Sequence, residues 1–454
     1  MLFKLSKLTK EEYVFLIGHL LCLAIGESVL GYIIISVLFL YALRNLLKHN
    51  YTPVFLLLLL GSYHSKFNSV YTTELGGINF IYLLIICFAL ISMIKINLPK
   101  KSLFFLAPIF ILYILNAIFG FYFKYSFGWY VNELISFTIF YFFIIIIIGF
   151  SKEQRTNVLQ VLAHYVIYFY PALTLVSIIT AGEENLFFDE FEKFYFISII
   201  PILFLKIPRK FLIILLHIVV FSLKAKYTYT SSLNILFIAI SVVMLFFIIK
   251  ISLIKKVGFV VLVFLGAFIV YQTSSKLTKF KIYQAQTAIP KMFEGDVSSI
   301  PKSPRVRAVE FIISFENLKQ AGMIFQLIGK GYGSYIDDNE TNFFKKYKIR
   351  LKEEDYSEVE TKLQHYKKGH GGISYIPIKM GIVGLVLFLI FCIMSFFVLI
   401  KYKNLKWLAI SAPFYIITTF SYGMKNFIFV GVVIGLVLSI NYKYPNEKRT
   451  SIYS

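Results

Sequence analysis

The sequence predicts an all-α polytopic membrane protein, with about 14 transmembrane helices and one large extracytoplasmic loop between helices 11 and 12. The composition, a series of apolar segments and the charges between those segments support this fold class. Hydrophobic residues make up 58% of the chain and charged residues 15%, whereas soluble domains carry about 45–50% and roughly 25%. A soluble fold of 454 residues could not bury so much Phe, Ile and Leu. Lipid must therefore solvate part of the surface.

The apolar segments are separated by short polar stretches, and most approach the roughly 17–25 residues that a spanning helix needs. The segment 51–63, the two between residues 192 and 223, and the last two are short, so tilted, kinked or re-entrant geometries stay open for them. The predicted spans are 11–26, 29–43, 51–63, 78–95, 102–121, 128–150, 157–180, 192–206, 210–223, 231–249, 256–272, 373–400, 407–421 and 426–441.

The charges of the connecting segments alternate along the chain. With a cytoplasmic N-terminus, every inside segment is basic, and the outside segments include the acidic stretch 181–192 and the stretch 64–77. This is the positive-inside pattern, and it accounts for the net charge of +22 without a nucleic-acid partner. Both termini are then cytoplasmic. The inside segments are 44–50, 95–101, 151–156, 206–210, 250–256, 401–406 and 441–449.

Three regions follow from this topology. Residues 1–272 hold helices 1–11, residues 273–371 form the extracytoplasmic loop with short helices, and residues 372–454 hold helices 12–14 and a cytoplasmic tail. Loops of about a hundred residues without a purpose are uncommon. Apolar spacing predicts a helix over 304–320, and a charge-rich pattern predicts another over 350–367.

Cofactor signals are missing from the sequence. The three cysteines, Cys22, Cys87 and Cys392, lie inside apolar segments without metal-ligand spacing. No carboxylate cluster for a metal and no nucleotide-binding motif is evident, so we expect neither a metal nor another cofactor.

Three stretches carry a family resemblance: SPRVRAVEFIISFENL (303–318), LIGKGYGSY (327–335) and GHGGISYIPIKMGIVGLVLFLIF (369–391). In this order and spacing they resemble the O-antigen polymerase and ligase superfamily of membrane glycosyltransferases. Three features depart from the family pattern: Gly371 follows the histidine where Asn is usual, the stretch 339–368 is longer and more charged, and an earlier external loop (222–232) carries lysines where relatives often have arginine.

The resemblance implies an O-antigen polymerase, which joins undecaprenyl-diphosphate-linked oligosaccharide repeat units during lipopolysaccharide or related polysaccharide biosynthesis. It implies a bacterial inner (plasma) membrane location, an active site on the periplasmic or outer face, and a chain-length regulator and a flippase as partners. Two alternatives stay open. One is an O-antigen ligase, which transfers the chain to lipid A-core. The other is a flippase or transporter of lipid-linked sugars, although the sequence lacks the two similar halves usual in transporters.

Cations are expected to bind the diphosphate released by the reaction, because fixed positive charges stabilise developing negative charge. The planar fork of arginine suits phosphate oxygens, which indicates Arg305 or Arg307. These two residues are two positions apart, so they cannot share one helix face, and which of them faces the site stays open. Lys224 and Lys226, expected beyond a helix end, are further cations for the diphosphate or for lipid headgroups.

Four further positions complete the predicted site. His370 has a side chain suited to accept a proton from the attacking sugar hydroxyl. Gly331 and Gly333, with Tyr332 between them, indicate a tight turn whose amides could approach phosphate. Glu133 is an ionisable group near lipid depth, which indicates substrate binding or a buried structural partner. A purely structural role stays open for each of these residues.

Overall fold

The computed structural model describes most of the chain, and every structural statement below concerns that part. It comprises residues 7–25, 28–60, 74–75, 78–93, 100–181, 192–203, 205, 207–227, 232–248, 252–294, 297–339, 341–351, 356–367, 369, 372–402, 405–419 and 423–441.

Helices dominate the described residues, and two short antiparallel strand pairs, β1–β2 and β3–β4, occur among them. Up to the predicted loop the elements are α1 (Lys10–Ile25), α2 (Val29–Leu47), α3 (Thr52–Leu60), β1 (Glu74–Leu75), β2 (Ile78–Asn79), α5 (Phe80–Met93), α6 (Lys100–Tyr122), α7 (Phe127–Gly149), α8 (Lys152–His164), the π-helix η1 (Tyr165–Phe169), α9 (Tyr170–Ala181), α10 (Glu192–Ile202), α11 (Lys210–Tyr227), α12 (Ser232–Ile248) and α13 (Leu253–Thr273).

The later elements begin with the helices of the predicted loop and end with the long apolar helix α19 and two shorter apolar helices. They are α14 (Lys276–Phe293), the 3-10 helix η2 (Val297–Ser299), α15 (Lys302–Ala321), α16 (Met323–Ile328), β3 (Ile336–Asp337), α17 (Phe343–Lys346), α18 (Glu358–Leu363), β4 (His365–Tyr366), α19 (Gly372–Ile400), α20 (Lys406–Thr419) and α21 (Gly423–Asn441).

Each of the fourteen predicted spans contains an α-helix. Five described helices are long and apolar enough to cross a membrane: Val29–Leu47, Phe127–Gly149, Lys152–Thr180, Lys256–Thr273 and Gly372–Ile400. Three further apolar helices are shorter: Leu106–Tyr122, Lys406–Ile417 and Asn426–Ile440. The chain is therefore an all-α protein with several membrane-crossing helices, and the full count of fourteen crossings stays a prediction.

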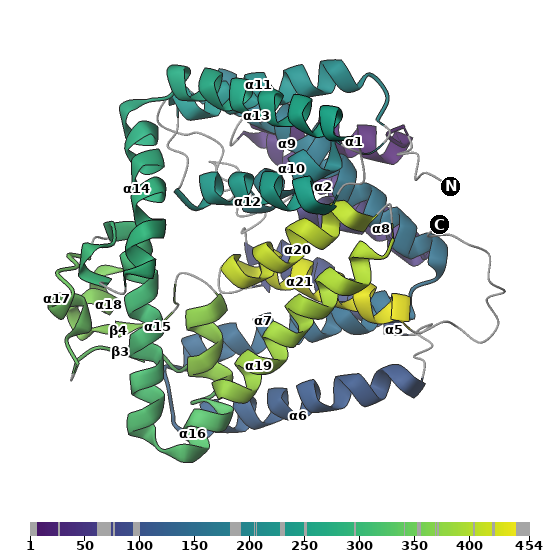
Figure 1. Cartoon of the computed structure of the whole chain (residues 1–454). Coiled ribbons are helices and arrows are strands. Elements are labelled where there is room, and N and C mark those ends of the chain that lie inside the picture. The colour runs from purple at the N-terminus through teal and green to yellow at the C-terminus, as the bar shows by residue number, and fades with distance from the viewer. Residues whose placement is uncertain are drawn as a thin grey trace.

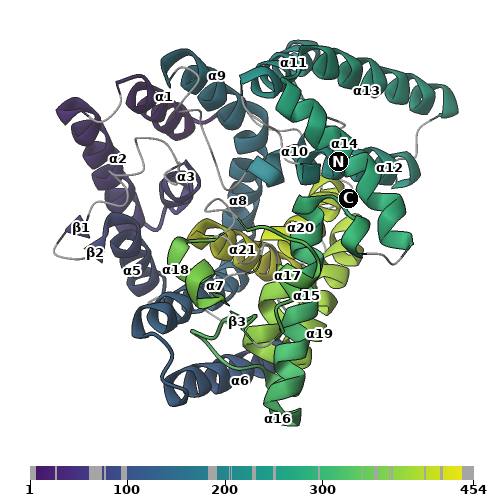
Figure 2. The same cartoon turned by 90° about the vertical axis from the view of Figure 1, so that its left-hand side faces the viewer.

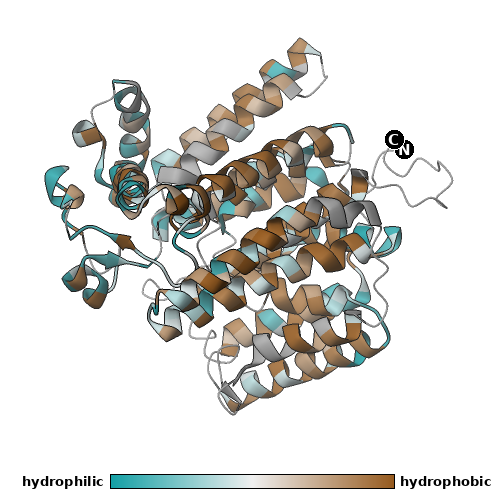
Figure 3. Ribbon diagram, turned by 90° about the horizontal axis from the view of Figure 1, so that it is seen from below, coloured by the Kyte–Doolittle hydropathy of each residue, from teal (hydrophilic) through white to brown (hydrophobic). Residues whose placement is uncertain are grey.

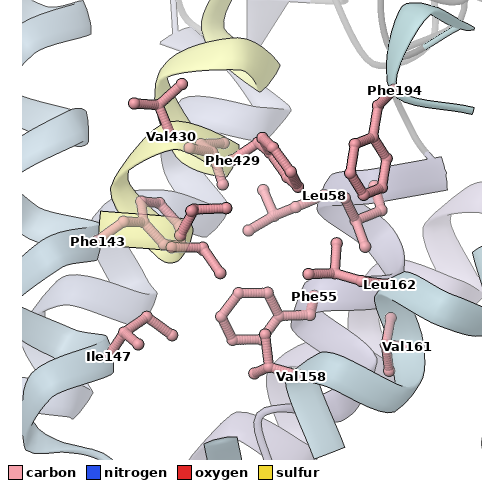
Figure 4. Packing of buried hydrophobic residues seen from close by; sticks show 14 of the residues in the cluster. Phe55, Leu58, Phe143, Ile147, Val158, Val161, Leu162, Phe194, Phe429 and Val430 are labelled. Atoms are coloured by element: carbon pink, nitrogen blue, oxygen red, sulfur yellow. The ribbon is translucent and has the colours of Figure 1, made fainter. Parts of the chain in front are cut away.

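Close packing between α7 and α21 forms the centre of the helix bundle. Gly431 and Gly435 of α21 are four residues apart and lie directly against the α7 backbone at Phe140 and Ile144. This small-xxx-small spacing lets two helices approach closely in lipid. Large apolar side chains of α3, α7, α8, α10 and α21 fill the space beside this contact (Figure 4).

The segment between α13 and α19 lies at one end of the bundle. In Figure 1, α14 and α15 run across the ends of helices such as α6, α7 and α19, at the left of the view. Figure 2 looks onto this end, where α15, α17 and α18 lie in front of the bundle. Hydrophilic residues gather on this segment, whereas apolar residues dominate the bundle helices (Figure 3). This arrangement fits a segment outside the lipid.

Of the two helices predicted in the loop, the helix over 304–320 is confirmed, and the helix over 350–367 is present over only part of that range. The helix predicted over 304–320 is α15, and Val306, Val309, Ile313 and Leu318 are buried as its apolar pattern requires. The helix predicted over 350–367 is limited to α18. It begins at a capping box formed by Ser357 and Glu360, and its chain turns at Gln364 in the left-handed conformation before entering β4.

Helix α19 contains a break at Gly381, where φ is 65° and ψ is −166°. Only glycine adopts this backbone conformation without strain. A Cβ atom at this position would also overlap the backbone of Leu327 and Ile328 in α16. The break therefore lets α16 and the residues after it press against α19.

Replacing Gly381 with Ala should destabilise the protein by at least about 1–3 kcal/mol from backbone strain alone, with the overlap against α16 adding to it. The matched control is Gly266→Ala in α13, where a Cβ meets no atom within 4 Å. We expect a clearly lower apparent Tm in detergent for the Gly381 variant and an unchanged Tm for the control. Equal melting temperatures would contradict this account of the break.

Candidate functional site

A glycine-rich turn, Gly329–Ser334, follows α16 and inserts between α6, α7 and α19. Gly329, Gly331 and Gly333 all have positive φ angles, between 81° and 86°. A Cβ atom at Gly329 would overlap the backbone of Lys379, and one at Gly331 would lie 2.5 Å from the amide nitrogen of Gly120. The turn predicted from the sequence is therefore present, and its glycines allow backbone to lie against backbone.

Backbone hydrogen bonds join this glycine turn to two helices. Lys330 and Gly331 donate their N–H groups to the carbonyls of Ile378 and Lys379, at 2.9 and 3.1 Å. In an unbroken helix these carbonyls would accept from residues 382 and 383, but the break at Gly381 leaves them available. Tyr332 donates its N–H to the carbonyl of Asn116 in α6 at 3.1 Å.

A buried ion pair lies beneath the turn. Glu133 of α7 and Lys379 of α19 are 2.7 Å apart, and their side chains are 2% and 0% exposed. The second carboxylate oxygen of Glu133 accepts the N–H of Gly333 at 2.6 Å. The ammonium group of Lys379 also donates to the carbonyl oxygen of Ser334. Both charges are therefore compensated by each other and by the turn.

The structure brings four of the predicted site residues together here: Glu133, Gly331, Tyr332 and Gly333. The Tyr332 ring is fully buried and stacks on Phe137 with 4.6 Å between ring centroids. Glu133 and Tyr332 thus anchor the turn inside the protein. The contacts of Glu133 are those of a buried structural partner, one of the two roles that the sequence left open for it.

A pocket of about 320 Å³ opens beside the glycine turn. The turn between α6 and α7, the junction of α15 and α16, and residues 330–337 contribute to its walls. Aromatic rings dominate the lining, together with one lysine and one aspartate. The lining residues are Phe123, Tyr125, Ala321, Phe325, Lys330, Tyr335 and Asp337.

The two tyrosines of the pocket stay protonated at neutral pH. Burial raises the pKa of Tyr125, and the nearby Tyr335 and Glu133 raise it further. Burial also raises the pKa of Tyr335, with a second contribution from Asp337. Their hydroxyl groups can therefore donate and accept hydrogen bonds. Such a pocket suits a ligand with apolar faces and many hydroxyl groups.

The predicted arginines do not line this pocket. Arg305 donates to the backbone carbonyls of Ile300 at 2.6 Å and Tyr347 at 3.1 Å, within the loop segment itself. Arg307 donates to the carbonyl and the hydroxyl of Ser303, both at 3.0 Å. At 1.5 Å per residue, both lie roughly 20 Å or more along α15 from Ala321 at the pocket. Their assignment to the diphosphate stays a prediction.

The predicted position of Lys224 and Lys226 beyond a helix end is wrong, because α11 continues through both residues to Tyr227. Lys224 is 3% exposed, forms an ion pair with Glu192 at 2.9 Å and donates to the hydroxyl of Tyr170 at 2.7 Å. Lys226 is exposed and lies over the ring of Tyr227. The contacts described for these lysines do not include the glycine turn.

His370 lies outside the described residues, and the following contacts concern described residues near it in sequence. Gly369 lies against Ser374 near the start of α19. Ser374 is 3.4 Å from a carboxylate oxygen of Glu310, and the hydroxyl of Tyr356 donates to the other oxygen at 2.5 Å. Glu310 is fully buried.

Several residues of the site were missed by the sequence reasoning. Lys379 had a usable signal, since an ionisable residue inside an apolar helix indicates a special role. Lys330 and Tyr335 lie within the glycine motif 327–335 but were not singled out. Tyr125 and Asp337 had no signal, because Tyr125 becomes a neighbour of residues 330–337 only through packing between two separate segments.

A second pocket of about 300 Å³ lies between the α2–α3 connection and the start of α8, lined by residues such as His49, Asn50 and Glu153. It is at the opposite end of α7 from the glycine turn, so it shares none of the predicted site residues.

No family model, curated protein or solved structure matches the chain. The functional argument therefore depends on the residues of the site.

Breaking the buried ion pair should destabilise the protein strongly. Lys379→Met leaves the Glu133 charge without its ion-pair partner in a buried site, which should lower the free energy of unfolding by about 3–5 kcal/mol. The double variant Glu133→Leu with Lys379→Met removes both charges and should recover part of that stability. The control is the exposed pair Glu358 and Lys362, 2.7 Å apart, where Lys362→Met should change stability by less than about 0.5 kcal/mol. Apparent Tm values of the purified variants test this, and a Lys379 variant as stable as the Lys362 variant would refute it.

Proposed function

We propose that the chain is a polytopic membrane glycosyltransferase of the O-antigen polymerase type. It joins undecaprenyl-diphosphate-linked oligosaccharide repeat units on the non-cytoplasmic face of a bacterial plasma membrane. The donor is the growing chain on its lipid diphosphate, and the acceptor is the terminal sugar of a second lipid-linked unit. The chain-length regulator and the flippase belong to the same proposal.

The observation that carries the proposal is the pocket beside the glycine turn. It combines four aromatic side chains with Lys330 and Asp337, a lining in which rings can stack on the C–H faces of sugars while charged groups bind hydroxyls or phosphate. Its lining residues come from the connection between the apolar helices α6 and α7 and from the segment between α13 and α19, and so lie at a boundary between the two. A ligand with a lipid part and a sugar part needs such a boundary.

The reaction forms one bond and breaks another. The acceptor hydroxyl oxygen attacks C1 of the donor sugar, the bond from C1 to the phosphate oxygen breaks, and the lipid diphosphate leaves with the electron pair. The acceptor proton passes to a base, the role predicted for His370. A cation such as Lys330 stabilises the leaving diphosphate, and Asp337 accepts a hydrogen bond from a sugar hydroxyl.

The acceptor separates the polymerase from the ligase. Purified protein supplied with its cognate lipid-linked repeat unit and no nucleotide sugar should make a ladder of longer lipid-linked products. Deleting the gene should leave lipid A-core with a single repeat unit, because a separate ligase still acts. A folded protein that makes no ladder but loads chains onto lipid A-core would replace the polymerase proposal with the ligase.

Replacing Lys330 with Ala should lower the rate of ladder formation by on the order of 10²–10³, the usual loss for a donor aimed at developing charge. Lys319→Ala is the matched control, since Lys319 is exposed near the end of α15 and outside the pocket lining. Both variants should express and melt like the parent protein. A Lys330 variant with full activity would remove that residue from the mechanism.

The proposed orientation can be tested by labelling. In a background without the native cysteines, Cys substitutions at Ser298 and Glu358, both exposed in the segment between α13 and α19, should react with a membrane-impermeant thiol reagent applied to the outer face. Cys at Glu153, exposed at the start of α8, should react only after the membrane is permeabilised. The reverse pattern would invert the topology.

A further inference from the structure

Aromatic side chains at the junction of α6 and α7 have two different environments. Phe121 and Tyr122 at the end of α6 and Phe127 at the start of α7 are 74%, 74% and 77% exposed, as expected for rings at a membrane interface. Tyr125 in the connection and Trp129 in α7 are partly buried and lie against Tyr335, which follows the glycine turn. One local sequence thus supplies two sets of rings with different surroundings.

The inward-facing rings form a continuous group around Tyr335. Its ring centroid is 6.0 Å from that of Tyr125 and 6.1 Å from that of Trp129, both edge-to-face. The ring of His365 in β4 stacks on Tyr335 at 4.0 Å, and Phe123 extends the group beyond Tyr125 at 6.1 Å. We name these five residues, Phe123, Tyr125, Trp129, Tyr335 and His365, the aromatic row.

Polar groups lie along the edges of the aromatic row. The Oδ2 atom of Asp337 is 3.7 Å from Nε2 of His365, and the amide nitrogen of Asn339 is 3.0 Å from the same ring nitrogen. The ammonium group of Lys367 lies 5.5 Å from the centroid of the Trp129 indole. Lipid chains offer no partners for such polar groups. Their presence beside Trp129 and His365 therefore argues that these rings do not belong to the exposed rings at the membrane interface.

The aromatic row begins in the pocket and leaves it. Phe123, Tyr125 and Tyr335 line the pocket, whereas Trp129 and His365 lie beyond it, the latter in β4. Phe123 is exposed and the other four rings are partly buried, so a ligand can reach them. The rings contact one another at centroid distances of 4.0 to 6.1 Å, which leaves a ligand the outward faces and edges of a continuous aromatic surface.

We infer that the aromatic row binds several consecutive sugar units of one oligosaccharide, with the innermost unit in the pocket and the outer units on Tyr335, Trp129 and His365. This inference rests on the proposed function, because it identifies how the same site holds its glycan. Rings supply apolar contact to each sugar face, and Asp337, Asn339 and Lys367 bind the hydroxyl or acidic groups around it. Affinity then increases with the number of sugar units until the row is filled.

Binding can be measured without any reaction. The chain has two tryptophans, Trp129 and Trp407, and Trp407 is 3% exposed. In a Trp407→Phe protein, Trp129 fluorescence reports on the row. The probes are water-soluble fragments of one, two and three repeat units, released by mild acid from the surface polysaccharide of the source cell. We expect saturable fluorescence changes and Kd values that fall with fragment length.

Paired substitutions separate ring stacking from folding. Tyr335→Leu keeps apolar bulk without a ring and should weaken binding of the longest fragment about tenfold, which equals 1.4 kcal/mol. Tyr335→Phe keeps the ring and should bind more tightly than Tyr335→Leu, and the belt variant Tyr122→Leu should bind like the parent protein. If the Tyr335→Leu protein does not fold, the same Leu and Phe pair at His365 replaces it. Equal Kd values for Leu and Phe variants, or Kd values independent of fragment length, would overturn the inference.

The two proposals fail separately. A protein that makes polymer ladders but shows no length-dependent binding, or is unaffected by the Leu substitutions, retains the proposed function and loses the aromatic row. A protein that binds fragments as predicted, but makes no ladder from lipid-linked units, retains the row and loses the polymerase assignment.

Discussion

Inside a bilayer every charge and every backbone polar group needs a partner within the protein, and the outer end of this bundle is organised around that constraint. Helix α19 breaks at Gly381, which frees the carbonyls of Ile378 and Lys379, and the glycine turn supplies the N–H groups that they need. An unsatisfied polar group buried in this junction would cost several kcal/mol. The ion pair of Glu133 and Lys379 closes the same junction with two compensated charges.

The contacts of this junction hold the residues that line the pocket in position. The backbone N–H of Lys330 donates to α19, which fixes the position of this residue. Tyr335 comes one residue after Ser334, whose carbonyl accepts a hydrogen bond from Lys379. Tyr125 lies against Gly333, close enough that a Cβ there would be 3.1 Å from its own. The binding surface is thus held by the rigid helices through a short turn. Such placement favours precise orientation of the glycan that we propose binds here.

Sequence reasoning predicted the local features well and the distant pairings poorly. Continuous apolar segments located a helix in all fourteen predicted spans, and apolar periodicity located the buried face of α15, because both signals lie within a short stretch of chain. Glycine spacing predicted the turn for the same reason. The sequence could not show that Glu133 pairs with Lys379 or that Lys224 is buried beside Glu192. Nor could it show that Tyr125 and Phe121 have different surroundings. Each of these depends on packing between segments far apart in the chain.

The long sequence separation within the junction also constrains how the protein is made. The N–H of Gly333 comes 200 residues after the carboxylate that it contacts, and Lys379 comes later still. At roughly 5–20 residues per second, the ribosome therefore needs about 10–40 s to supply the first partner of Glu133. During that interval the Glu133 carboxylate lacks both partners that it has in the finished structure. Biogenesis, and not only the finished structure, is thus sensitive to residues near the end of the chain.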